Sequence, residues 1–425
     1  MEVTLPYISL SVFLLLVAFK FLSKARTQKN LPPSPPALPV ISHLHLLKQP
    51  LHHTLHQLSQ NLGSVFSLRF GSHLVVVVSS PFAVEECFTK NDVVLANRPR
   101  VAFGKYLGYN YTTIVAASFG DHWRNLHRIM VVEIFSTSRL NAFLSIRQDE
   151  IKLLLPRLSQ NLSRDFKRVE LKPKWIDYHS EKNLGRIHKK MDAFLQDLIN
   201  EHRRDKSKNT MIDHLLSLQE SHPDYYADEI IRGLILVMIL GGTNTSAVTV
   251  EWTLSLLVNH PEVLKKARAK VDTHVGQERL IDEPDLSKLH YLQVIISETF
   301  RLFPTELLLL PHISSDDCII EGYNMPRDTI LLVNAWAIHG SPKVWDDPTS
   351  FKPEWFEGGE VGHKLMPFGL GRRACLGAGM AQRIEETFDL AEGSGLATPK
   401  VKPLEAMYKV RNIVDKVLYK VTNDV

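Results

Sequence analysis

The stretch Pro367–Met380 holds the residues most able to do chemistry. It reads Pro-Phe-Gly-Leu-Gly-Arg-Arg-Ala-Cys-Leu-Gly-Ala-Gly-Met, so Cys375 is surrounded by four glycines and two arginines. Glycines let a backbone approach another group closely, and neighbouring arginines favour a thiolate over a thiol. The apolar run Leu376–Ile384 predicts a helix whose N-terminus adds positive potential at the sulfur. We therefore predict that Cys375 is a metal ligand or a nucleophile; the alternative is a buried structural cysteine in a Gly-rich turn.

A long apolar helix is predicted over Asp228–Asn259. Gly241 and Gly242 lie in its middle, where two glycines cost about 2 kcal/mol relative to alanine. That cost indicates close approach to a flat ligand, unless the glycines are merely tolerated in a packed helix. The stretch Thr243-Asn244-Thr245-Ser246 follows, and a hydroxyl there can satisfy a broken helix hydrogen bond or pass protons to a ligand.

Two further predicted helices carry charged groups. Trp123–Arg128 reads Trp-Arg-Asn-Leu-His-Arg, and its indole N–H and basic groups suit an anion such as a carboxylate. The helix Asp285–Phe303, with Asp285 as a predicted N-cap, places Glu298 and Arg301 three residues apart, where they can pair.

Short alternating segments predict two hairpins. The first joins Ser64–Phe70 to Leu74–Ser79, and the second joins Cys318–Glu321 to Thr329–Asn334. Charged segments are predicted as solvated helices: Asp149–Lys174 and Lys182–Lys208.

The N-terminal region predicts a membrane anchor. Leu5–Leu22 is mostly apolar and spans about 27 Å as a helix, which matches the bilayer of the endoplasmic reticulum. Lysines and an arginine follow it, so the rest of the chain is expected in the cytosol. A cleaved signal peptide is the alternative; Glu2 before the apolar run and the lack of an Ala-x-Ala site argue against it.

The chain divides into three parts on this interpretation: an anchor over 1–22, a basic, proline-rich hinge over 23–40, and a single domain over 41–425. Five prolines between Leu31 and Val40 predict a stiff spacer, with an SH3-type ligand as the weaker alternative. His52 and His56, four residues apart, could share a metal, but a surface helix is the preferred interpretation.

Composition excludes several classes of protein. The 425 residues are 44% hydrophobic and 23% charged, which is enough to build a large core. A formal charge of +4 without a basic stripe argues against nucleic acid as a partner. Three cysteines cannot form a disulfide framework, which indicates a reducing compartment.

Taken together, these motifs resemble those of cytochrome P-450 monooxygenases. The spacing Phe368-x-x-Gly371-x-Arg373-x-Cys375-x-Gly377 is similar to their haem-binding loop. With the other helices, the anchor and the hinge, the resemblance to a microsomal plant cytochrome P-450 covers nearly the whole chain. The phrases Leu107–Thr113 and Asn334–His339 are most similar to the group that contains isoflavone hydroxylases.

The resemblance implies a mainly α fold with small β-sheets (α+β) behind a single membrane anchor. It also implies haem b, with the Cys375 thiolate as the axial ligand of the iron. One atom of O2 would enter a C–H bond of a small apolar or phenolic plant metabolite, with electrons from NADPH through a membrane-bound reductase. The implied partners are therefore that reductase, membrane lipid, O2 and the substrate.

The resemblance assigns roles residue by residue. The implied haem-binding residues are Trp123, His127, Arg128, His312, Phe368, Gly369, Arg373, Cys375 and Gly377. The implied catalytic residues at the oxygen site are Gly242, Asn244 and Thr245. Glu298 and Arg301 would form a structural ion pair behind the haem.

The chain departs from the family pattern at particular positions. His127 stands where an arginine usually binds a propionate, and Asn244 stands where an acid is usual. Trp355 replaces the arginine that usually pairs with Glu298, so we expect Glu298 to lack a partner at a cost of about 1–3 kcal/mol. Glu306 places a carboxyl in a segment that is usually apolar toward the substrate.

The chain is also short for this family. Segments are predicted to be missing between Lys174 and Trp175 and again after Ile384. Two alternatives to the monooxygenase follow: a membrane-anchored, non-catalytic remnant that binds haem poorly, and a hydrolase with Cys375 as nucleophile. The hydrolase lacks a recognisable His–acid pair in the sequence.

Overall fold

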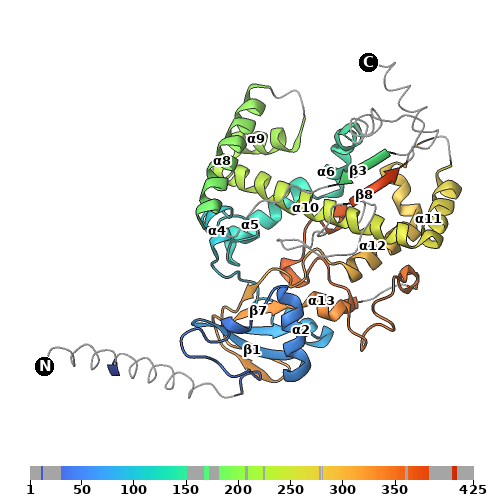
Figure 1. Ribbon diagram of the computed structural model, residues 1–425. Coiled ribbons are helices and arrows are strands. Elements are labelled where there is room, and N and C mark those ends of the chain that lie inside the picture. The colour runs from blue at the N-terminus through green and yellow to red at the C-terminus, as the bar shows by residue number, and fades with distance from the viewer. Residues whose placement is uncertain are drawn as a thin grey trace.

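The computed structural model describes residues 11–12, 30–150, 167–171, 181–205, 209–223, 225–276, 279, 281–358, 362–381 and 404–408. The predicted anchor lies outside these residues, apart from positions 11 and 12, and so do the last three residues, 382–384, of the helix predicted after Cys375. The described residues form a mainly helical body with a small sheet region at one end (Figure 1). The predicted fold class, mainly α with small β-sheets, is confirmed.

The main sheet has four strands in the order β1-β2-β7-β4. β1 (Val65–Phe70) and β2 (His73–Val78) form the first predicted hairpin, whose turn contains Gly71 at a φ of 60°. β7 (Ile330–Val333) runs parallel to β2, and β4 (His312–Ile313) runs antiparallel to β7. The valines of β2 alternate between two core clusters, one on each face of the sheet.

The second predicted hairpin is wrong. β5 (Cys318–Ile320) pairs instead with β6 (Tyr323–Met325), because Glu321 and Gly322 adopt φ values of 46° and 80° and close a tight turn. β7 is thereby free to join the main sheet. A third sheet pairs β3 (Lys167–Leu171) with β8 (Leu404–Tyr408), so the predicted helix over 149–174 is wrong at β3.

The described part of the proline-rich hinge is bonded to the main sheet. The Ser67 amide donates to the Pro33 carbonyl at 2.8 Å, and the Ser67 hydroxyl donates to the Pro32 carbonyl at 2.9 Å. The His43 ring lies 2.9 Å from the Pro35 carbonyl through Nε2. The segment is therefore held by hydrogen bonds as well as by the stiffness of its prolines.

The helices cover most of the chain, and their bounds largely follow the periodic patterns of the sequence. The helices are η1 (Leu44–Leu46), α2 (Leu51–Leu62), α3 (Pro81–Phe88), α4 (Ala102–Tyr106), α5 (Asp121–Ile129), η2 (Met130–Ile134), α6 (Thr137–Ala142), α8 (Glu181–Arg204), α9 (Met211–Ser221), α10 (Asp228–Asn259), α11 (Pro261–His274), η3 (Glu283–Lys288), α12 (His290–Leu302), α13 (Ala335–His339), η4 (Pro353–Phe356), η5 (Gly362–Lys364), η6 (Gly371–Arg373) and α14 (Ala378–Ala381).

The predicted bounds of α10 are confirmed, whereas those of α12 are not. α12 begins at His290, and the preceding residues form the separate turn η3. Asp282 caps η3, and Asp285 is the third residue of its capping box rather than the N-cap of the long helix.

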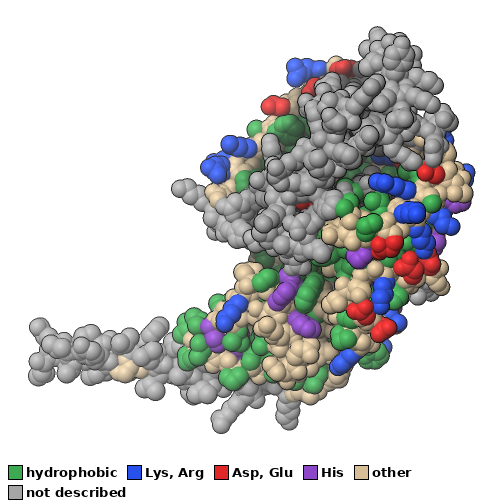
Figure 2. All heavy atoms as spheres, turned by 45° about the vertical axis from the view of Figure 1, so that its right-hand side comes forward, with side chains coloured by type: hydrophobic (Ala, Val, Ile, Leu, Met, Phe, Trp, Pro, Cys, Tyr) green, Lys and Arg blue, Asp and Glu red, His purple; other side chains and the backbone are tan. Residues whose placement is uncertain are grey.

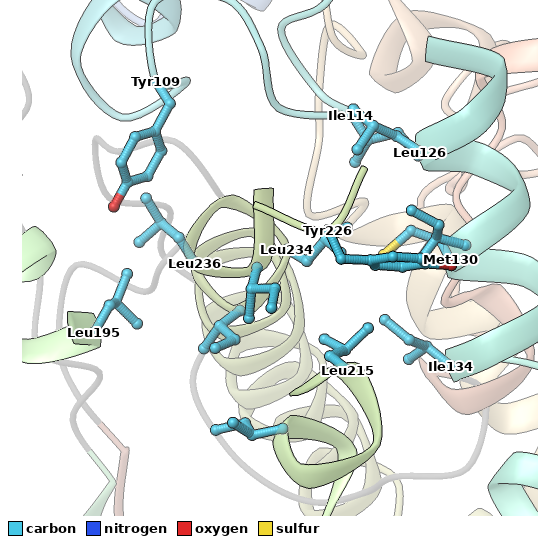
Figure 3. Packing of buried hydrophobic residues seen from close by; sticks show 14 of the residues in the cluster. Tyr109, Ile114, Leu126, Met130, Ile134, Leu195, Leu215, Tyr226, Leu234 and Leu236 are labelled. Atoms are coloured by element: carbon cyan, nitrogen blue, oxygen red, sulfur yellow. The ribbon is translucent and has the colours of Figure 1, made fainter. Parts of the chain in front are cut away.

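α10 crosses the body and packs against α8, α9, α11 and α12 (Figure 1). In Figure 3, Leu236 lies on the side of α10 toward Tyr109 and Leu195, and Leu234 lies on the side toward Tyr226. Among the described residues, α10 is the one helix long and apolar enough to cross a membrane. Its packing on four neighbours is that of a core helix.

Candidate haem-thiolate site

The loop before α14 presents the Cys375 thiol. The Cys375 amide donates to the Phe368 carbonyl at 2.8 Å and closes the loop. Gly369 and Gly371 hold φ values of 67° and 66°, a region that favours glycine. The Cys375 side chain is exposed, so its sulfur is available to a ligand on the open side of the loop.

Gly371 also sits against Asp92. A Cβ added to Gly371 would lie 2.4 Å from Oδ1 of Asp92, so only glycine fits without a shift. The Asp92 carboxylate accepts a hydrogen bond from the Arg372 amide at 3.0 Å and pairs with the Arg372 guanidinium at 3.2 Å. Asp92 therefore anchors the loop to the segment that follows α3.

Arg373 is turned away from the thiol. Its guanidinium donates to three backbone carbonyls, those of Ala96 at 2.6 Å, Ile114 at 3.0 Å and Ala117 at 2.6 Å. Although Cys375 is exposed on one side, desolvation by the protein around its sulfur raises the pKa of the thiol, and a hydrogen bond from the Gly377 backbone opposes this only partly. The prediction that the two arginines favour the thiolate is therefore wrong, and deprotonation depends on a bound metal.

Trp123 and Arg373 join α5 to the thiol loop. The Trp123 indole N–H donates to the Ile114 carbonyl at 3.1 Å, the same carbonyl that Arg373 uses. The Arg373 guanidinium lies 4.6 Å from the centre of the Trp123 ring, a cation–π contact. This contact brings the two side chains together, while their role toward haem stays a prediction.

Arg98 and His312 complete a group of buried basic side chains. Nδ1 of His312 lies 2.6 Å from the Leu95 carbonyl, and burial lowers the pKa of His312 well below its usual range. Arg98 donates to the carbonyls of Leu310 and Pro311 at 2.7 and 2.8 Å, while its buried Nε has no hydrogen-bond partner among the described residues.

Arg98 and Arg373 place two positive charges close together in this buried region. Burial, reinforced by the charge of Arg98, lowers the pKa of Arg373 to about 9, and burial lowers that of Arg98 to about 10. Burial destabilises the charge of both guanidinium groups, and Arg98 further destabilises that of Arg373, so an anion beside them is favoured. The sequence analysis missed Arg98, because the loop Asn97–Pro99 has no periodic or spacing signal of its own.

The structure separates His127 from Arg128. The His127 ring lies 4.9 Å from the Trp123 ring, and burial and Arg373 lower its pKa. Arg128 instead lies beside Tyr225, where its charge opposes the rise in the Tyr225 pKa that burial causes. Of these two predicted residues, only His127 lies next to the buried basic side chains described above.

The middle of α10 is open. Ideal Cβ atoms built on Gly241 and Gly242 meet nothing within 4 Å, and both residues are exposed although α10 is buried toward each end. The Thr245 hydroxyl donates to the Gly241 carbonyl at 2.5 Å within a continuous helix. Leu240 of α10 and Leu376 of the thiol loop pack against one hydrophobic cluster, which brings this open stretch and the loop to the same part of the body.

Glu298 and Arg301 form the predicted ion pair, but Glu298 does not lack a partner. Its carboxylate accepts hydrogen bonds from Nε and Nη2 of Arg301 at 2.6 and 2.7 Å and from the Lys352 amide at 2.8 Å. Both side chains are fully buried. Burial still raises the pKa of Glu298, although the bonds from Arg301 oppose that rise. A backbone amide thus supplies a hydrogen bond that the sequence analysis expected to be lost.

Comparison with known proteins identifies this arrangement. The cytochrome P450 family model matches residues 32–174 and 157–388. The chain belongs to the cytochrome P450 family. It is 51% identical to cytochrome P450 81Q32 of Catharanthus roseus, with 98% of both chains covered. It is 46% identical to an isoflavone 2'-hydroxylase of Glycyrrhiza echinata, with 97% of this chain and 99% of the relative covered.

The fold of this P450 is shared by solved structures. A zebra fish cytochrome P450 structure with progesterone matches with a TM-score of 0.72 at 22% identity, covering 85% of this chain and 100% of that chain. The chain is therefore an oxygen-dependent monooxygenase by family, with a small-molecule substrate and haem iron as its cofactor.

This P450 lacks internal segments that its relatives have. The alignment with the Catharanthus roseus protein runs over 491 positions, whereas the chain has 425 residues, so at least 66 positions (the difference) have no counterpart here. The two matches to the family model meet near Lys174, where the sequence analysis places the first gap.

The described residues fit a haem group. The glycine-rich loop exposes a thiol, the mid-section of α10 is open, and the buried cations Arg98 and Arg373 would accept the propionates of a porphyrin. Arg98 in particular has a buried Nε without a hydrogen-bond partner in the part of the chain that the structure describes.

Proposed function

We propose that this P450 hydroxylates a small aromatic plant metabolite of the isoflavonoid type. The observation that carries the proposal is the exposed Cys375 on a glycine-rich loop that also carries the buried cation Arg373. Relatives named isoflavone 2'-hydroxylase and isoflavone 3'-hydroxylase, each 46% identical over nearly the full chain, support the substrate class.

We assign separate roles to the residues of the site. Cys375 is the iron ligand, and haem when bound supplies the metal at which O2 is activated. Arg98 and Arg373 would neutralise the propionates, and a propionate beside His312 would favour the charged form of its ring. Trp123 fixes the position of Arg373 through their shared carbonyl. The conformation of the loop that orients the Cys375 sulfur depends on Phe368, Gly369 and Gly377.

The oxygen side of the site belongs to α10. Gly242 leaves room for a ligand close to the helix backbone, as the open space at its Cβ position allows. The Thr245 hydroxyl, which now donates to the Gly241 carbonyl, can turn and hold a proton at the oxygen side. Asn244 offers an amide in place of a carboxyl, so it can orient a water molecule but does not supply a proton.

We further propose that the chain sits in the membrane of the endoplasmic reticulum as a single-pass protein, with residues 41–425 in the cytosol. The apolar segment over 1–22 and the basic residues after it support this placement. NADPH would then deliver electrons through a reductase anchored in the same membrane.

The test is the carbon monoxide difference spectrum of the reduced, full-length protein in membranes. We expect a Soret band strongly shifted to the red, and we expect Cys375→Ser to abolish it. Cys318→Ser serves as the matched control, since Cys318 belongs to β5 and packs in another cluster. Hydroxylated products should then form from an isoflavone when NADPH and reductase are added.

A second candidate is a membrane-anchored remnant without turnover. The observation that favours it is the gap of at least 66 positions, because the missing segments would otherwise contribute to the body around the site. Failure to bind haem, or a band typical of histidine-ligated haem, would decide for the remnant and against the monooxygenase. The hydrolase alternative is disfavoured, because the raised pKa of the Cys375 thiol makes it a poor nucleophile.

A further inference from the structure

A cleft of about 210 Å³ lies between α11, η3, α12 and the loop after η4, apart from the thiol loop. Its lining residues come from four segments: Lys270, His274, Lys288, Leu289, His290, Tyr291 and Glu357. Figure 2 turns the α11 side of the molecule toward the viewer and shows basic, acidic and histidine side chains mixed on that face.

Lys266 engages the acidic side chain of the cleft. Nζ of Lys266 lies 3.0 Å from the Glu357 carboxylate and 3.2 Å from that of Glu354. Although burial opposes it, these bonds raise the pKa of Lys266. Nζ of Lys266 also lies 4.0 Å from the centre of the Tyr291 ring, so Lys266 is held against one of the residues that line the cleft.

Lys270 and Lys288 line the cleft with exposed ammonium groups, and the charge of Lys288 acts on the nearby Asp285 carboxylate. Among the residues that the structure describes, neither forms a recorded ion pair, and both are exposed. Asp285, the carboxylate near Lys288, is already engaged by two hydrogen bonds from Arg279 at 2.5 and 2.7 Å. The imidazoles of His274 and His290 add further donors at the rim.

The shape and donors of the cleft select a small anion. Leu289 and Tyr291 are buried and make an apolar floor, while the basic groups stand around the mouth. Lysine ammonium groups bind as point charges and suit a tetrahedral phosphate, whereas planar carboxylates are better matched by arginine forks. The volume exceeds that of a single phosphate and leaves room for a second one.

We propose that this cleft binds a small phosphate-bearing anion through Lys270 and Lys288. The phosphate can be inorganic or part of a phosphate ester, since both offer the same tetrahedral oxygens. The site is separate from the proposed monooxygenase chemistry, so either proposal can fail without the other.

The experiment titrates the haem-loaded, full-length protein in detergent with inorganic pyrophosphate and follows binding by calorimetry. We expect saturable binding that Lys270→Gln with Lys288→Gln weakens about tenfold or more. Lys265→Gln with Lys364→Gln is the control, because both lysines lie outside the cleft and the charge change is the same. Far-ultraviolet circular dichroism should be the same in all variants, which shows that they fold whether or not haem is bound.

Comparing the binding of two ligands distinguishes an inorganic phosphate from a phosphate ester. Tighter binding of adenosine diphosphate than of pyrophosphate indicates a phosphate ester, and the reverse order indicates the inorganic anion. Equal binding by the cleft and control variants, or no saturable binding at all, would overturn the proposal. A cleft variant that raises only the KM for the reductase, with no binding of pyrophosphate, would also overturn it and assign the cleft to a protein interface.

Discussion

The guanidinium of Arg301 lies 4.7 Å from the centre of the Trp355 ring, a cation–π contact in a dry site. Trp355 stands where the family usually has a second arginine, yet the pair is not left incomplete. Arg301 also donates to the carbonyls of His339, Pro348 and Ser350 at 3.1, 2.7 and 3.0 Å. An aromatic face and backbone groups thus take over from the missing ionic partner.

Replacing Trp355 by alanine should destabilise the fold. We expect a loss of about 2 kcal/mol in the free energy of unfolding, because a desolvated cation–π contact is removed. Lys343→Ala is the control, since Lys343 is exposed and, among the described residues, its side chain has no recorded ion pair or ring contact. Equal effects of the two variants in chemical denaturation would refute the role given to the ring.

Replacing Glu298 by glutamine tests the ion pair itself. Breaking a buried pair leaves Arg301 uncompensated, so we expect a loss of about 3–5 kcal/mol and little soluble protein. Glu354→Gln is the comparison, because Glu354 is half-exposed and pairs with Lys266 at the surface. A Glu298→Gln protein as stable as the Glu354→Gln protein in thermal melts would contradict this account.

Gly371→Ala should disturb the thiol loop. The substitution forces alanine into a φ of 66° and places its Cβ against Asp92, so we expect a cost of about 1–2 kcal/mol or more and reduced haem content. Gly379→Ala is the matched control within the same motif, because a Cβ there meets nothing within 4 Å. Thermal unfolding and absorbance in the Soret region measure both effects, and identical behaviour of the two variants would exclude a special role for Gly371.

Arg98→Ala should weaken retention of haem. A hydrogen bond to a charged group contributes about 1.5–3 kcal/mol, so we expect haem to transfer to apomyoglobin about tenfold faster or more. Arg98→Lys, which keeps the charge, should be less affected. Arg372→Ala is the control, because its half-exposed guanidinium pairs with Asp92. Haem retention by Arg98→Ala equal to that of the control would remove Arg98 from the site.

The Glu306 carboxyl should make the free energy of unfolding depend on pH. Burial raises the pKa of its carboxyl from 4.5 to about 8, and among the described residues no hydrogen bond to that carboxyl is recorded. Between these two values the folded protein keeps a proton that the unfolded chain releases, so stability falls as the pH rises through this window.

The variant Glu306→Gln should remove that fall. Above pH 8 we expect it to be more stable than the parent by about 1–3 kcal/mol, the usual cost of an unsatisfied buried polar group. Urea unfolding at a series of pH values checks the sign. A stability of the parent protein that is flat across the window, or that rises with pH, would show that Glu306 is ionised in the folded state.

The sequence by itself determined the features that depend on local spacing. The thiol loop around Cys375, the bounds of α10, the first hairpin and the pairing of Glu298 with Arg301 all follow from periodicity, glycines and short-range geometry. Local patterns are enough there because the residues that interact are near in the chain.

Only the tertiary structure decided which distant groups meet. It gave Glu298 the Lys352 amide and Arg373 three carbonyls of the segment 96–117, and it brought Arg98 beside Arg373. It also placed β7 in the main sheet rather than in a local hairpin. These partners are backbone groups or loop residues far apart in the chain. Backbone donors and acceptors are the same at every position, so such contacts cannot be predicted from residue type.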